Sequence, residues 1–159
     1  MVVYGAFSED SSRDADRYVD QLVRLGVDVE WRVVVRKPGG RTSPAAAAVA
    51  ARVGAGAHDL RRALFAAYWD SSLDIDDPNV LEEILGEPPV FDEARATYWQ
   101  RAWRGFERPD LPLVRLTTGY VFRGPRAMEQ LEALVRRRSA APAPRRTRRT
   151  ISRARLADR

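Results

Sequence analysis

The chain has 159 residues and is 45% hydrophobic, which suits one domain with a substantial core. It has no cysteine and one histidine, so disulfides, thiolate nucleophiles and cysteine zinc sites are excluded and no metal site is expected. The net charge of +5 arises in residues 139–159, which hold seven arginines and one aspartate. Residues 1–138 hold 20 basic and 21 acidic residues, so their charge gives no sign of a nucleic-acid-binding face.

The N-terminal part of the chain predicts a strand, a helix and a second strand. Residues 2–7 are apolar and mostly β-branched or aromatic, as in a buried strand. A polar loop follows, in which Ser11 or Ser12 is expected to cap a helix that ends at Gly26. Residues 28–35 predict the second strand, which a right-handed crossover would place parallel to the first.

Helices and a hairpin are predicted for the rest of the domain. Residues 44–105 carry helical periodicity and read as an all-helical insertion. Residues 113–116 and 120–122 flank a tight turn and predict a β-hairpin in the same sheet, followed by a last helix with Leu131 on its apolar side.

The composition changes at Ser139 to Ala, Pro, Arg, Thr and Ser. We interpret residues 139–159 as a disordered basic tail, which lacks interleaved aromatic residues and would therefore contact nucleic acid only nonspecifically. Residues 1–138 form the predicted domain. Because no basic stretch precedes an apolar run and no apolar run approaches about 18 residues, we expect a cytoplasmic protein with no membrane contact.

The order of these elements resembles the DsbA-like variant of the thioredoxin fold, over residues 2–138. Val3-Tyr4-Gly5-Ala6-Phe7 resembles the strand that leads into the active loop of that family. Ala67-Tyr68-Trp69 and the stretch 73–81 resemble the helical part that DsbA-like proteins share with 2-hydroxychromene-2-carboxylate isomerases. Leu111-Pro112 lies where the family has its cis-proline. The resemblance implies an α/β, thioredoxin-like fold with an all-helical insertion.

The active loop departs from the family pattern. DsbA-like proteins carry Cys-Pro-x-Cys here; in one alignment Glu9 takes the place of the first cysteine and Ser12 that of the second. A shift of one residue puts Ser8 where kappa-class glutathione transferases and the related isomerases have a serine followed by proline. The proline is absent in either alignment, because Glu9 follows Ser8 and Asp10 follows Glu9. The resemblance therefore makes Ser8, Glu9 and Ser12 the candidate catalytic residues, without disulfide chemistry. The alternative is that these residues only cap the helix.

The resemblance also implies where a ligand would lie. Leu111 and Pro112 would offer backbone groups to glutathione or to an extended peptide, with a cis bond before Pro112. The alternative is that Pro112 only forms a structural turn into the hairpin. Trp69 and Trp99 would line an apolar substrate pocket, although aromatic residues at helical spacing also suit a core. No cofactor follows with certainty from the residues; the resemblance implies glutathione or another low-molecular-weight thiol.

Three functions stay open at this point. The first is a redox-inactive thioredoxin-like protein that binds a small molecule or a peptide. The second is a glutathione-dependent isomerase or transferase in which Ser8 or Ser12 hydrogen-bonds the thiolate, and an open apolar cleft over this loop would favour it. The third is a non-catalytic partner-binding protein whose basic tail does the binding, which a cleft filled by side chains would favour. His58 is expected at the surface, with no catalytic role. The sequence does not indicate the oligomeric state.

Overall fold

The computed structural model describes residues 1–36 and 42–140 of the chain. Most of the predicted tail lies outside the described residues, and only Ser139 and Ala140 belong to them, at the end of the last helix. Within the described part, no helix is both long enough and apolar enough to cross a membrane. The cytoplasmic location stays a prediction.

A four-stranded mixed sheet occupies the centre of the molecule, in the order β2-β1-β3-β4. β1 (Val2–Gly5) runs parallel to β2 (Glu30–Val33) and antiparallel to β3 (Leu113–Arg115), which forms a hairpin with β4 (Val121–Arg123). The predicted single sheet is confirmed, with its parallel first pair. The apolar runs extend beyond β1 and β2, because Phe7 and Val34 are buried although they follow the last paired residues of these strands.

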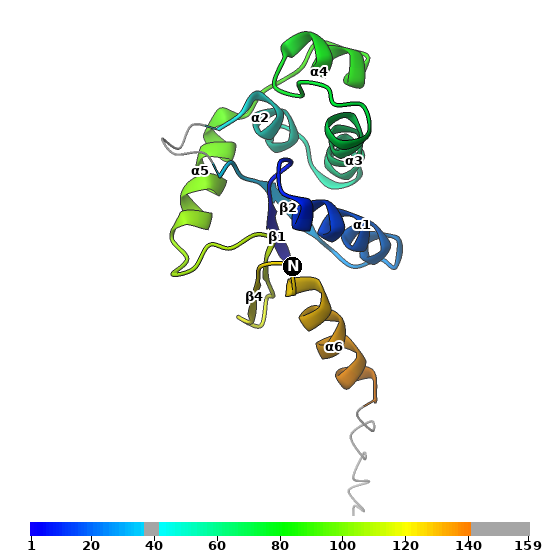
Figure 1. The fold of residues 1–159 in the computed structure, drawn as a ribbon, viewed down its shortest axis with the longest axis vertical. Coiled ribbons are helices and arrows are strands. Elements are labelled where there is room, and N and C mark those ends of the chain that lie inside the picture. Colours follow the sequence, from blue (N-terminus) through cyan, green and yellow to red (C-terminus); the bar gives the residue numbers. More distant parts are fainter. Residues whose placement is uncertain (37–41, 141–159) are drawn as a thin grey trace, which may run out of the picture.

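The described residues form six helices around this sheet, and the predicted all-helical insertion is confirmed, since residues 44–105 contain no strand. α1 joins β1 to β2, α2 to α5 form the insertion, and α6 follows β4. α2, α3 and α4 gather beyond one end of the sheet, and α6 leaves from the other end (Figure 1). Their bounds are α1 Asp10–Arg24, α2 Pro44–Ala50, α3 Gly54–Asp70, α4 Pro78–Leu85, α5 Glu93–Arg104 and α6 Ala127–Ala140.

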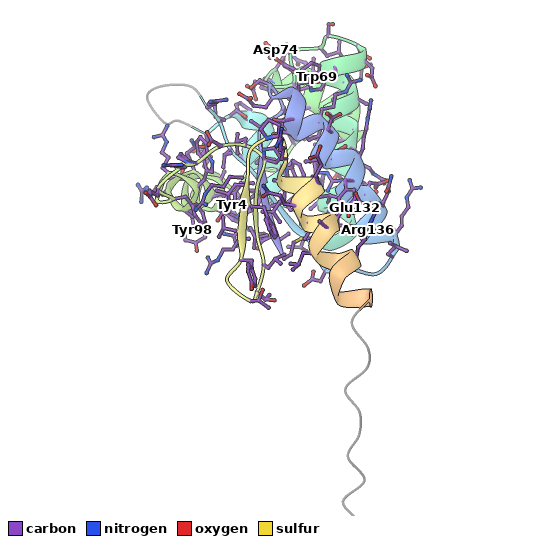
Figure 2. The ribbon with its side chains drawn as sticks, turned by 60° about the horizontal axis from the view of Figure 1, so that its bottom comes forward. Tyr4, Trp69, Asp74, Tyr98, Glu132 and Arg136 are labelled. Atoms are coloured by element: carbon purple, nitrogen blue, oxygen red, sulfur yellow. The ribbon has the colours of Figure 1, made fainter. Side chains whose placement is uncertain are left out.

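The alternation of side chains along β1 divides the core between the two faces of the sheet. Val3 belongs to the larger cluster, which includes residues of α1, α3 and α6. Tyr4 belongs to the smaller cluster on the other face, together with Trp103 and Leu113. Arg32 lies over the rings of both Tyr4 and Tyr98, at 5.5 and 5.8 Å, on the side that Figure 2 shows with these two labels.

The last residue of β1 must be a glycine because an indole packs directly on its backbone. A Cβ atom on Gly5 would lie 2.2 Å from Cζ2 of Trp31. Trp31 is buried and contacts the ring of Phe65 edge-on, with 5.8 Å between the ring centroids. This close packing fixes the end of β1, from which the loop to α1 departs.

A buried ion pair connects α1 with α3. Asp16 Oδ1 lies 2.5 Å from Nε of Arg61, whose side chain is fully buried and lies 5.1 Å above the ring of Trp31. His58, expected at the surface, is half-buried there, and its Nδ1 lies 2.8 Å from Nη1 of Arg61. Burial raises the pKa of Asp16 and lowers the pKa of Arg61.

Candidate functional site

The first turn of α1 is not capped by a serine, so that prediction is wrong. Glu9 is the N-cap residue, and its side chain makes no capping hydrogen bond. Ser12 is fully buried, and its Oγ accepts a hydrogen bond of 3.1 Å from the backbone N of Ala6. Ser11 Oγ donates to the backbone O of Leu111 at 3.2 Å. Both serines therefore attach the helix start to neighbouring chain segments.

The peptide bond between Leu111 and Pro112 is cis, as the resemblance implied. The bond from Ser11 to the Leu111 carbonyl places this peptide directly beside the first turn of α1. On the other side, the Pro112 carbonyl accepts from the backbone N of Gly124 at 3.0 Å. The cis peptide therefore joins the start of α1 to the turn that connects β4 with α6.

The structure brings one of the two predicted pocket tryptophans to the loop. Trp69, at the insertion end of the molecule in Figure 2, donates from Nε1 to the backbone O of Phe7 at 2.9 Å. Arg13 lies 5.2 Å from the centroid of the Trp69 ring. Trp99 is 2% exposed, belongs to the core and lines neither of the clefts beside the loop, described below. The aromatic residue of the insertion that lines open space beside the loop is Tyr68.

Two open clefts flank the loop, in place of the single site that the sequence predicted. The first, which we call the Ser8 cleft, has a volume of about 460 Å³ and lies between the loop, the end of β2 and the insertion. Its wall is mainly apolar, with Ser8 at the loop side. The lining residues are 6–8, 33–36, Ser43, Tyr68 and 74–76.

The second space, which we call the cis-proline cleft, has a volume of about 510 Å³. It lies between the first turn of α1, the segment before Pro112 and the start of α6. The lining residues are Glu9, Ser11, Arg36, Asp110, Leu111, Arg123, Gly124, Pro125, Arg126 and Gln130. Glu9 and Leu111, two of the predicted site residues, therefore meet here, whereas Ser8 lies in the other cleft.

An ion pair links the walls of the two clefts. Arg36 lines both, and its Nη1 lies 3.1 Å from Oε1 of Glu9. Arg123 and Arg126 are exposed on the wall of the cis-proline cleft, and neither forms an ion pair within residues 1–36 and 42–140. Sequence analysis missed these arginines because no motif marks them; they follow Glu9 by more than 100 residues.

The two clefts differ in the side chains that they offer to a ligand. The chain has no thiol, and Ser12 is buried. Ser8 is exposed, but the one histidine of the chain, His58, contacts Arg61 and lines neither cleft. The carboxylates of Asp74 and Asp76 line the same cleft as Ser8. The guanidinium groups of the cis-proline cleft are, by contrast, well suited to holding an anion.

Comparison with known proteins identifies the fold. No protein-family model matches the chain, and no curated protein sequence matches it. The structure is similar to the crystal structure of reduced DsbA1 from Neisseria meningitidis, with a TM-score of 0.63 and 18% sequence identity, over 86% of this chain and 82% of that chain. The chain thus has a DsbA-like thioredoxin fold and contains no cysteine.

Proposed function

We propose that this chain is a binding protein that uses a DsbA-like thioredoxin fold without dithiol chemistry. Its ligand, a small molecule or an extended peptide, occupies the cis-proline cleft. The observation that carries the proposal is the open space of about 510 Å³ between the first turn of α1, the cis peptide and the start of α6. Ligand pockets in proteins span roughly 300–1,000 Å³, so this cleft has room for a small ligand or a short peptide segment.

The loop residues support binding in preference to catalysis. Ser11 and Leu111 both line the cis-proline cleft, and the hydroxyl of Ser11 holds the carbonyl of Leu111, so this hydrogen bond fixes part of the wall. A wall fixed in the free protein lowers the ordering cost of binding. The third possibility, a protein with a filled cleft that acts only through its surface, has less support because side chains leave this space open.

Amide chemical-shift mapping tests the proposal. The probes are the blocked hexapeptides Ac-(Ala-Glu)3-NH2 and Ac-(Ala-Gln)3-NH2, titrated into the ¹⁵N-labelled protein. We expect shift changes that cluster at Ser11, Leu111 and Gly124. The Gln130→Trp variant should remove them by filling the cleft from the exposed side of α6. Gln21→Trp, at an exposed position of α1 outside the cleft, is the matched control. Shifts that cluster elsewhere, or that survive Gln130→Trp, contradict the proposal.

A second candidate function is a glutathione-dependent isomerase or transferase, and the exposure of Ser8 in an open, mainly apolar cleft favours it. Ser8 would hydrogen-bond the thiolate of glutathione or of another low-molecular-weight thiol. The carboxylates of Glu9 and Asp10 argue against this candidate, because they come one and two residues after Ser8 and would repel a thiolate at the start of α1. A calorimetric titration, described in the Discussion, separates this candidate from the first.

A further inference from the structure

We infer that the cis-proline cleft selects ligands that carry two or more carboxylates, such as an acidic peptide segment or a small polycarboxylate. This inference rests on the proposed function, since it names the ligand class of the same site. It starts from three arginines that line one cleft: Arg36, which follows β2, and Arg123 and Arg126, at the two ends of the turn between β4 and α6.

Two of these cations are available to a ligand. Arg123 ends β4 and Arg126 directly precedes α6, and both side chains are exposed. Neither is engaged in an ion pair within the part of the chain that the structure describes. A guanidinium group presents its donors in a planar fork that matches a carboxylate in two parallel hydrogen bonds. Two such forks on one wall suit a ligand with two separated carboxylates.

The third cation is already paired, with a carboxylate that belongs to the protein. Arg36 contacts Glu9 at 3.1 Å, and the side chain of Arg36 is 59% exposed. A ligand carboxylate can therefore reach Arg36 in competition with Glu9. Replacing Glu9 by glutamine should strengthen the binding of an acidic ligand, because it frees Arg36 and removes a negative charge from the cleft.

The acidic residues of the cleft do not cancel this field. Glu9 and Asp110 are the carboxylates among the lining residues, against the three arginines. Asp110 is exposed, as are Arg123 and Arg126, so solvent screens these three charges alike, and the lining keeps an excess of one positive charge. The neutral polar groups add little, because the hydroxyl of Ser11 is engaged by Leu111. The field in the cleft therefore favours an anion.

Fluorescence anisotropy with fluorescein-labelled Ac-(Ala-Glu)3 and Ac-(Ala-Gln)3 peptides tests the inference, and citrate serves as an unlabelled competitor. Because exposed ion pairs are individually weak, we expect the acidic peptide to bind about tenfold more tightly than the neutral one. Arg123→Gln/Arg126→Gln should remove this difference. Glu9→Gln should increase it by roughly threefold. Displacement by citrate would identify a small polycarboxylate as sufficient; its failure to displace would assign the preference to a peptide.

The matched control is Arg17→Gln/Arg115→Gln, which removes the same charge from exposed positions on α1 and at the far end of β3. Equal weakening by the control and the cleft variant would show a general charge effect and overturn the inference. Equal affinity for the two peptides, lost in Gln130→Trp, would overturn the inference and leave the proposed function standing. Binding of neither peptide would overturn the inference and would also remove the support for the proposed function. Thermal unfolding of each variant checks that it folds.

Discussion

The side-chain amide of Gln100 pairs with both backbone groups of Val35. Its Oε1 accepts from Val35 N at 2.8 Å, and its Nε2 donates to Val35 O at 2.7 Å. Gln100 lies on α5 and is 2% exposed. Beyond the end of β2, its amide provides the donor and the acceptor that the backbone of a neighbouring strand would provide. The next residue is Arg36, which reaches Glu9 across the loop. The insertion thereby fixes the point from which Arg36 extends.

Gln100→Leu should lower the free energy of unfolding by about 1–3 kcal/mol, because two backbone groups of a partly buried segment lose their partners. Urea unfolding measures the change. Gln21→Leu, at an exposed position, should stay within about 0.5 kcal/mol of the natural protein. A loss in Gln100→Leu no larger than in this control would show that water replaces the amide without cost.

The natural protein should not catalyse thiol–disulfide exchange, because no side chain can form a mixed disulfide. The double substitution Glu9→Cys/Ser12→Cys should restore measurable insulin reduction. Glu9 is the N-cap of α1 and Ser12 lies in its first turn, so a thiolate at residue 9 would gain from the helix amides. Glu9→Cys alone is the control. Turnover by the natural protein above a boiled sample would contradict the first expectation, and an inactive double variant would contradict the alignment of the loop.

Glutathione should bind weakly or not at all to the natural protein, and more tightly to Glu9→Ser/Asp10→Pro. The double substitution removes two carboxylates next to Ser8 and places serine at the N-cap and proline at the first helical position, both of which suit a helix start. Isothermal titration calorimetry of both forms measures the affinity. Tight binding by the natural protein would promote the enzyme hypothesis over the non-catalytic one. No binding by either form would leave the Ser8 cleft without support as a thiol site.

Acid should destabilise the protein through His58. Burial, followed by the charge of Arg61, lowers its pKa below 6.5 in the folded state. Between the folded and the unfolded pKa the unfolded chain binds more protons, so stability is fully present above about pH 6.5 and falls as the pH drops through this window. His58→Gln should remove this part of the dependence in urea unfolding curves. The imidazole proton resonances, which come from one histidine, report the folded pKa directly. A midpoint above 6.5 would refute the argument.

The sequence predicted the elements well because they depend on local patterns. The apolar run of β1 and the helical insertion were both recognisable, and the order of elements led to the cis bond at Pro112. Helical periodicity does not reveal the pair of Asp16 and Arg61, because a charged residue on a helix usually lies outside, whereas these two pair in the interior.

The site itself depends on contacts between distant segments, which composition and spacing do not contain. The division into two clefts results from a pairing of Arg36 with Glu9, across 27 residues. The arginines of the cis-proline cleft reach the loop only because the hairpin returns β4 to the same edge of the molecule as the first turn of α1. The sequence predicted one site with Ser8, Leu111 and Trp99, whereas the fold places Ser8 in one cleft, Leu111 in the other and Trp99 in the core.

Because Trp69 is hydrogen-bonded to the carbonyl of Phe7, it is an intrinsic fluorescence probe of the loop. Of the four tryptophans, Trp31, Trp99 and Trp103 are at most 5% exposed, whereas Trp69 is half-buried and attached to the loop between the two clefts. Its emission is therefore the most sensitive to water and to the position of the loop. Acrylamide quenching and the emission maximum can follow ligand entry without a label, and Trp69→Phe provides the spectrum of the three buried indoles for subtraction.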